Sequence, residues 1–282
     1  MNEYIFSCET DSPKPVIQAL LAIKWKNSDP QPCSVSVSST GILFLTEDVS
    51  VLQANVYLKN PLFSRFYFNK NESEDSFVFR VNLTSLVDSL NVFAETASHL
   101  KIYIMKDATS DLRISIEDGT SITECTLRTL HCSPDQTELS KAYTLTDLRD
   151  AAQFIVGSFI VREMFRFPND SKNKSVGVAM TIDPIQKRFE VRAEGAFGVE
   201  TSIMSLTNMI QKVQIDIEER MTTNFPVSSL TPVLKAMAIS SESKFIFKEN
   251  GVLTVQQGVK GDGGVETVVE FILQPLEESP FN

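Results

Sequence analysis

Residues that could act as nucleophiles or general bases are few in this chain. It contains only two histidines, His99 and His131, and nucleophilic catalysis by Ser or Cys needs such a base. His99 comes just before an expected strand and His131 begins a polar segment, so we interpret both as surface residues. No glycine-rich phosphate loop of the GxxxxGK[ST] or GxGxxG kind occurs either. The sequence therefore predicts no nucleophilic or nucleotide-dependent active site.

The cysteines and carboxylates do not form a recognisable metal site. Cys125 and Cys132 are separated by six residues and have no Cys-x-x-Cys partner, whereas structural zinc needs a full set of closely paired ligands. Acidic runs at residues 72–75, 117–118 and 218–219 are candidates for the magnesium site of a nuclease, but their polar surroundings indicate solvated turns. We expect no catalytic residue, no bound metal and no cofactor.

The composition points to a folded protein without membrane segments. Its 282 residues are 42% hydrophobic, enough to bury a large core without disulfides or metals. No apolar run approaches the roughly 18 residues of a membrane span, and the N-terminus shows no basic start followed by an apolar stretch. The formal net charge of −10 argues against a protein that grips nucleic acid over its whole surface, but it allows a local basic face. We expect a soluble intracellular protein with no membrane contact.

Strand patterns dominate the elements that would position any site. Apolar and polar residues alternate over residues 34–38, and residues 77–81 suit a strand covered on both faces. The pairs Asp118-Gly119 and Asn250-Gly251 separate further apolar runs and predict hairpin turns. The pattern is typical of antiparallel sheets.

Four short stretches show apolar residues at helical spacing instead. Ser12 and Ser229 are expected to cap the first and the fourth helix, and Pro232 is expected to fall in the first turn of the fourth. The four stretches cover residues 13–25, 83–93, 158–166 and 229–237. Their outward positions carry the bases Lys14, Arg162, Arg166 and Lys235.

The order of these elements repeats along the chain. Helix, strands, helix and strands occur once before about residue 130 and again after about residue 152. The intervening residues are polar, with weak periodicity, and are interpreted as a connector. The sequence therefore predicts an α+β protein with similar domains at 1–130 and 151–282, joined by a connector at 131–150.

A stretch in the first half resembles a known family. Residues 51–58 are VLQANVYL, phenylalanines recur within 63–68, and residues 77–90 are FVFRVNLTSLVDSL. This succession of a Gln-Ala strand, an aromatic strand and a strand that continues into a leucine-rich helix resembles the sliding-clamp superfamily. Within it, the chain is similar to the radiation-sensitivity-one family, a subunit of the nine-one-one DNA-damage checkpoint clamp.

The second half carries the same resemblance. Residues 154–165, FIVGSFIVREMF, resemble that family's strand followed by a Leu-Arg-Glu-Ala-Phe helix. Residues 250–253 and 269–272 resemble its last strands. The resemblance therefore covers nearly the whole chain.

The resemblance implies a DNA-clamp fold of two repeated domains, each with antiparallel sheets on the outside and two helices on the inner face. In this family, the subunit and two homologous partners close a heterotrimeric ring around double-stranded DNA, independently of base sequence. The implied role is a non-enzymatic, nuclear platform for checkpoint signalling and repair proteins. A separate clamp loader that hydrolyses ATP would open the ring.

In such a clamp, the outward bases on the helices face the DNA and contact phosphates without reading sequence. The matching positions are Lys14, Arg162, Arg166 and Lys235. The second helix departs from a replicative clamp, because its only charged residue is Asp88 and it has no base. This departure favours the checkpoint family and predicts a weak hold on DNA, which a closed ring tolerates because its topology retains the DNA.

The resemblance also implies an apolar pocket for partner peptides, placed between the connector, an early strand and the C-terminal segment. The matching positions are Leu43, Leu45, Leu130, Leu139, Leu273, Gln274 and Pro275.

Other interpretations stay open beside this one. A homotrimeric processivity clamp would carry lysines on the second helix. A 3′–5′ DNA exonuclease would bring several carboxylates together around a metal. An α+β scaffold unrelated to DNA would leave the helix bases merely solvated.

Overall fold

The structure is a computed structural model that describes residues 3–26, 30–48, 51–69, 75–93, 95–107, 109–131, 148–168, 175–207, 212–260 and 266–277. The chain divides into two compact units, which are taken one at a time. Unit 1 comprises Met1–Glu47, Ala54–Thr144 and Val259–Val269, and unit 2 comprises Asp48–Gln53, Leu145–Gly258 and Glu270–Asn282.

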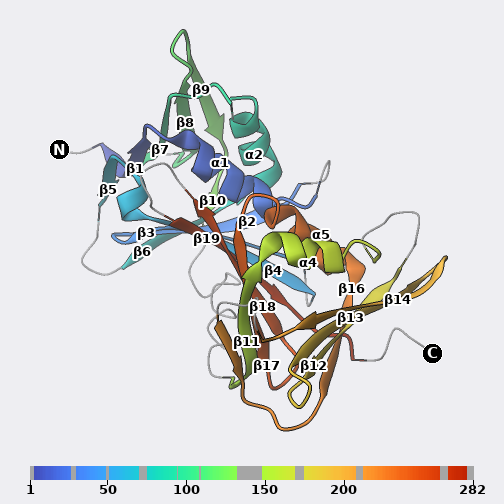
Figure 1. The fold of residues 1–282 in the computed structure, drawn as a ribbon. Coiled ribbons are helices and arrows are strands. Elements are labelled where there is room, and N and C mark those ends of the chain that lie inside the picture. The colour runs from blue at the N-terminus through green and yellow to red at the C-terminus, as the bar shows by residue number, and fades with distance from the viewer. Residues whose placement is uncertain are drawn as a thin grey trace. The chain divides into compact units, whose positions relative to one another are not determined.

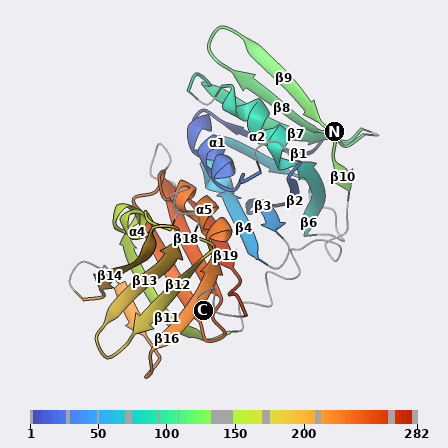
Figure 2. The same cartoon turned by 90° about the vertical axis from the view of Figure 1, so that its right-hand side faces the viewer.

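Unit 1 combines two sheets with the helices α1 (Pro13–Ala22) and α2 (Leu83–Asn91), which lie side by side in both ribbon views (Figures 1 and 2). One sheet is antiparallel throughout, in the order β5 (Arg65–Phe68), β1 (Tyr4–Thr10), β7 (His99–Met105), β8 (Leu112–Glu117) and β9 (Ile122–Leu127). The other has the order β10 (Leu130–His131), β6 (Ser76–Asn82), β2 (Pro32–Ser38), β3 (Gly41–Asp48) and β4 (Leu52–Lys59). A short 3-10 turn, η1 (Asn60–Leu62), follows β4.

Unit 2 repeats this arrangement with the helices α4 (Ser158–Met164) and α5 (Val227–Ala236). Its antiparallel four-stranded sheet has the order β14 (Gly198–Ser205), β13 (Arg188–Gly195), β12 (Gly177–Asp183) and β16 (Met221–Pro226). A second set of antiparallel neighbours has the order β18 (Leu253–Lys260), β17 (Glu242–Lys248), β11 (Asp150–Gly157) and β15 (Lys212–Ile215). The last strand, β19 (Glu266–Leu273), is divided between the two units.

The order of elements confirms the α+β expectation and its internal repeat. Unit 1 runs through a strand, α1, strands, α2 and further strands, and unit 2 runs through β11, α4, strands, α5 and further strands. The expected hairpins are also present. Gly119 lies between β8 and β9 with φ of 87°, and Gly251 lies between β17 and β18 with φ of 86°. Only a residue without a Cβ adopts this backbone region at little cost.

Aromatic rings fill much of each core. In unit 1, the rings of Phe6 and Phe79 are stacked with centroids 6.3 Å apart. In unit 2, the ring of Phe154 on β11 lies 5.2 Å from Phe189 and 5.3 Å from Phe245. Such contacts add to the free energy gained by burying apolar area, so β11 is held firmly where it leads into α4.

The expected start of α5 is wrong. The helix begins at Val227 with Pro226 at the N-cap, and Ser229 is buried in the first turn, where its hydroxyl donates to the Pro226 carbonyl at 2.8 Å. Pro232 consequently lies inside the helix instead of in its first turn. The reason is that β16 leads directly into the helix at Pro226, whose extended backbone ends the strand. In α1, Ser12 does occupy the N-cap, but its side chain makes no capping hydrogen bond.

Candidate nucleic-acid interface

The start of α4 is anchored by the Ser158 side chain. Its hydroxyl lies 2.8 Å from the Ser240 hydroxyl and 2.9 Å from the Ser243 hydroxyl. The backbone N–H of Ser158 donates to the Ser241 carbonyl at 3.0 Å. Because Ser158 is 1% exposed, this network fixes the helix to the start of β17 and so fixes the direction of its outer face.

The outer face of α4 carries two of the predicted DNA-facing bases. Phe159, Arg162, Glu163 and Arg166 are all exposed, and their spacing places them on one side of the helix. Arg166 lies just beyond the end of α4, with its Nη1 atom 3.8 Å from Glu163 Oε2. Among the described residues, Arg162 has no ion-pair partner, so this face holds a net positive charge.

Lys235 lies in the last turn of α5 and is exposed, as the sequence predicts. It too has no ion-pair partner within the part of the chain that the structure describes. In both ribbon views α5 lies beside α4 (Figures 1 and 2). The helices of unit 2 therefore offer three exposed bases against one acid, Glu163.

The helices of unit 1 are electrostatically different. Lys14 is exposed on α1, but its Nζ atom lies 3.0 Å from Glu95 Oε2. Asp88, the one charged residue of α2, forms an ion pair with Lys24, which follows α1. Two bases therefore face two acids, and the helical face of unit 1 has no net charge.

These pairs include residues that sequence reasoning missed. Lys24 and Glu95 lie outside the helical stripes, and each pairs with a residue more than 60 positions away. Phe159 was also overlooked, although its spacing of three and seven residues from Arg162 and Arg166 is visible in the sequence.

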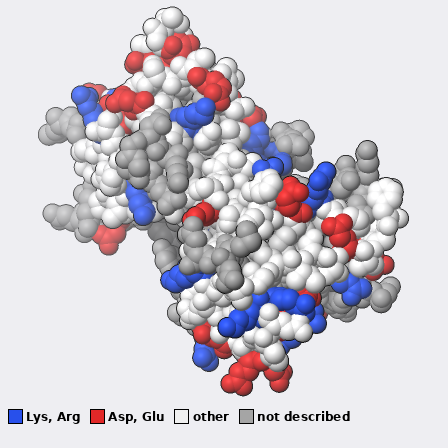
Figure 3. All heavy atoms as spheres, viewed as in Figure 1, with Lys and Arg blue, Asp and Glu red and all other residues white. Residues whose placement is uncertain are grey.

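A further basic group lies on the four-stranded sheet of unit 2, where Figure 3 shows a row of Lys and Arg atoms over β12, β13 and β14. Arg188 and Arg220 hold the same carboxylate, with Nη2 atoms 3.4 Å and 2.5 Å from the oxygens of Glu190. This group is separate from the helices and was not singled out by its sequence.

The residues expected to form a partner pocket differ in exposure. In unit 1, Leu43 packs against a small buried cluster of Leu45 and Val78. Leu45 is 1% exposed, whereas Leu130 on β10 is 72% exposed. Leu139 lies outside the described residues.

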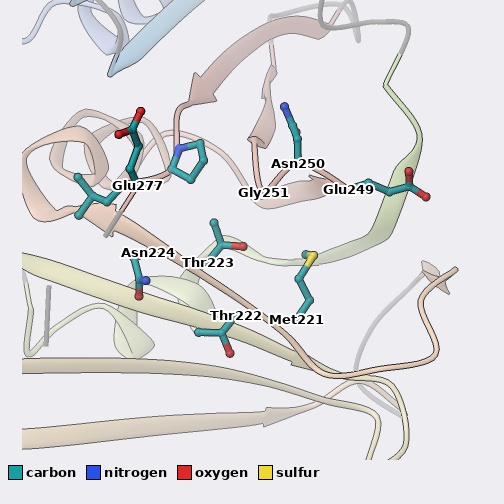
Figure 4. Close-up of a pocket in the computed structure, with 10 residues that line it drawn as sticks. Met221, Thr222, Thr223, Asn224, Glu249, Asn250, Gly251 and Glu277 are labelled. Atoms are coloured by element: carbon teal, nitrogen blue, oxygen red, sulfur yellow. The ribbon is translucent and has the colours of Figure 1, made fainter. Parts of the chain in front are cut away.

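In unit 2, Leu273 is fully buried, and Gln274 and Pro275 are half-buried. Pro275 lines a pocket of about 480 Å³, together with residues 221–224 of β16, residues 249–251 and the segment 275–277. Figure 4 shows Thr223 directed toward the turn that carries Asn250 and Gly251. Of the predicted pocket residues, this cavity includes Pro275 alone.

Two strands at sheet ends are unusually open. β9 ends the five-stranded sheet of unit 1 and β14 ends the four-stranded sheet of unit 2, and neither contains a buried residue. Their exposed apolar side chains include Ile122 on β9, at 66%, and Ile203 on β14, at 54%. Both edges therefore have free backbone groups and apolar surface for pairing with another chain.

The described residues contain no group of three His, Cys, Asp or Glu side chains placed to hold a metal ion. Cys8 is buried, and this burial raises the pKa of its thiol, so the reactive thiolate is not populated. His99 Nδ1 lies 2.7 Å from Asp11 Oδ1 on the surface. No helix among the described residues is long and apolar enough to cross a membrane.

Comparison with known proteins supplies an independent line of evidence. Residues 5–258 match the family described as "Repair protein Rad1/Rec1/Rad17". The DNA damage checkpoint control protein rad1 of Schizosaccharomyces pombe is 20% identical, with 97% of this chain and 87% of that protein aligned. The cell cycle checkpoint protein RAD1 of Mus musculus is 22% identical, with 99% and 95% aligned.

Solved structures show the same fold. The Proliferating Cellular Nuclear Antigen of Entamoeba histolytica superimposes with a TM-score of 0.73 at 14% identity, covering 97% of this chain and 99% of that one. A PCNA2–PCNA3 complex from Sulfolobus tokodaii gives a TM-score of 0.71 at 12% identity, covering 96% and 100%. The expected clamp fold is thereby confirmed.

Proposed function

Because the chain belongs to the Rad1/Rec1/Rad17 family of repair proteins, we propose that it is a subunit of a heterotrimeric, ring-shaped DNA-damage checkpoint clamp. With two homologous partners it encircles double-stranded DNA in the nucleus and acts as a non-enzymatic platform for checkpoint and repair proteins. The names of its relatives in Schizosaccharomyces pombe and Mus musculus support the checkpoint role.

The observation that carries this proposal is the pair of open edge strands. A subunit of a closed ring needs one edge for each neighbour, and β9 and β14 provide one edge in each unit. Pairing would satisfy their backbone groups and cover Ile122 and Ile203. Exposed edges of this length otherwise favour aggregation, so the chain alone is expected to self-associate.

Within the ring, we propose that Lys14, Arg162, Arg166 and Lys235 face the DNA and contact phosphates. The charges support unequal contributions of these bases to phosphate binding. Lys14 is already paired with Glu95, whereas Arg162 and Lys235 are not paired with any described residue. A few unspecific contacts suffice for a ring that slides, since the topology retains the DNA.

A clamp loader is required to open such a ring, and partner proteins need a docking place. We propose that Leu43, Leu45, Leu130, Leu139, Leu273, Gln274 and Pro275 form this place with the connector at 131–150. The exposure of Leu130 in unit 1 and the cavity beside Pro275 in unit 2 support it. We also propose that residues 1–130 and 151–282 are the two clamp domains that this connector joins.

The test is the mass of the chain by light scattering, alone and after co-expression with its two homologous subunits. We expect a trimer with one copy of each. Ile203→Lys should weaken assembly about tenfold, because it removes part of an apolar contact and places a charge at the joint. Lys there faces Glu190 on β13, which already pairs with Arg188 and Arg220, so circular dichroism should verify that the variant remains folded.

Ile185→Lys is the matched control, because Ile185 is 84% exposed in the turn after β12 and belongs to neither edge strand. A homotrimer formed by the chain alone would favour a processivity clamp instead. A monodisperse monomer that binds neither partner would contradict the ring itself.

A further inference from the structure

Phe159 is an aromatic residue in an unexpected place. Its side chain is 71% exposed, on the outer face of α4. The buried face of this helix is complete without it, because Val161, Met164 and Phe165 are each at most 8% exposed. Packing within the described unit therefore gives no reason for a phenylalanine at this position.

Two of the three exposed residues that share this face with Phe159 are positively charged. The third is the acid Glu163, whose Oε2 atom lies 3.8 Å from Arg166 Nη1. Arg162 lies three residues further along the same face, where Cβ atoms are about 5–6 Å apart. Arg166 lies seven residues along, about 10 Å along the helix axis. The hydrogen bonds from Phe165 N to the Val161 carbonyl and from Arg166 N to the Glu163 carbonyl continue the helical turn to Arg166.

This combination of one exposed ring and two guanidinium groups matches the chemistry of unpaired nucleotides. A stacked strand rises about 3.4 Å per nucleotide along its axis, so the length of this face corresponds to about three nucleotides. The bases of a duplex are closed to stacking from the side, whereas a single strand offers the flat face of every base.

We propose that Phe159 is a stacking platform for an unpaired base of single-stranded DNA, with Arg162 and Arg166 holding the flanking phosphates. This inference rests on the proposed DNA-facing role of α4 and adds a preference for single-stranded segments, as at a gap or a recessed end. The contact is independent of base identity, since every base has a π face. Because Ser158 anchors the start of α4, the backbone positions of Phe159 and the two arginines are fixed.

The test compares the affinity of the full chain for a labelled oligothymidylate and for a duplex of the same length, by fluorescence anisotropy. Phe159→Ala should lower the ratio of single-strand to duplex affinity about fivefold or more. Phe159→Leu should lower it similarly, because leucine keeps apolar volume but has no π face, and Phe159→Trp should restore it. Phe197→Ala, at a phenylalanine that is 72% exposed, is the matched control and should leave the ratio unchanged.

Circular dichroism would verify that these exposed-site variants remain folded. An unchanged ratio in Phe159→Ala would overturn the inference, and full single-strand affinity in Phe159→Leu would overturn stacking. In either case, weakened duplex binding by an Arg162→Ala/Arg166→Ala variant would leave the proposed function standing. Duplex binding that is unchanged by loss of both arginines would contradict the proposed DNA-facing role of α4 instead. Loss of a partner subunit by Phe159→Ala with an unchanged ratio would assign this face to protein contact and also overturn the inference.

Discussion

Replacing Arg162 and Arg166 together with alanine removes two of the three exposed bases in or next to the helices of unit 2. Each phosphate contact contributes about 0.9 to the slope of log affinity against log salt concentration. The double variant should therefore lower the magnitude of this slope by about 1.8 for duplex DNA. Raising the salt concentration from about 50 to 200 mM should therefore reduce the affinity of the double variant roughly twelvefold less than it reduces the affinity of the unmodified chain.

The ion pairs of the free chain modify this expectation only slightly for Arg166. Its contact with Glu163 is 3.8 Å long and both side chains are more than half exposed, so breaking it costs less than about 1 kcal/mol. Lys14 is held at 3.0 Å by Glu95, and its release leaves a carboxylate beside the phosphates. Lys14→Ala should consequently change the slope by less than about 0.5, which is about half of one contact.

Fluorescence anisotropy of a short labelled duplex over this salt range measures the slopes. Arg149→Ala is the matched control, because Arg149 pairs with Glu249 at 3.7 Å with exposures of 74% and 55%, against 82% and 54% for Arg166 and Glu163. Arg149 lies just before β11, away from the helices. A control that lowers the slope as much as the double variant, or a double variant with an unchanged slope, would refute phosphate contacts by Arg162 and Arg166.

Two further predictions concern the turns. Gly251→Ala should destabilise the fold by about 2 kcal/mol, because φ is 86° and a Cβ would lie 3.1 Å from Thr223 Cγ2. Gly119→Ala has the same backbone cost at φ of 87° but nothing within 4 Å, so it should cost about 1 kcal/mol, and equal urea midpoints for the two variants would contradict this. In the turn between β8 and β9, hydrogen bonds lower the pKa of Asp118 to about 2, and the bond from the backbone N–H of Thr120 contributes most. The stability from Asp118 is then present above about pH 4 and lost as pH falls toward 2, and an NMR titration midpoint near 4 would contradict it.

Local sequence patterns predicted the helices and strands well, because helix caps and apolar spacing depend on residues that are close together in the sequence. The helix expected at 83–93 is α2, Leu83–Asn91, with Asn82 accepting a hydrogen bond from Thr84 N at 3.0 Å as its cap. Its apolar side is buried at the expected spacing, and Asp88 is exposed as expected. The start of α5 was mispredicted because a serine before an apolar stripe also fits a residue inside the first turn.

The electrostatics of the candidate site could not be predicted in the same way. Lys14 pairs with Glu95 across 81 positions and Lys24 pairs with Asp88 across 64, so the net charge of a helix face depends on segments outside the helix. The exposure of the residues expected in the partner pocket could not be predicted either. Leu45 and Leu130 are both leucines in strands, yet one is 1% and the other 72% exposed, a difference set by tertiary packing alone.

The distribution of charge bears on how a clamp of the proposed kind would hold DNA. A chain with a net charge of −10 repels a polyanion over most of its surface, so attraction is confined to faces where bases outnumber acids. In unit 1 the acids Glu95 and Asp88 cancel the bases Lys14 and Lys24, whereas the described helices of unit 2 keep an excess of bases. The phosphate contacts of this subunit would then be few and confined to those helices. Few contacts lower the free-energy barrier to sliding, because few counterions are displaced at any step, and they leave closure of the ring as the main cause of retention.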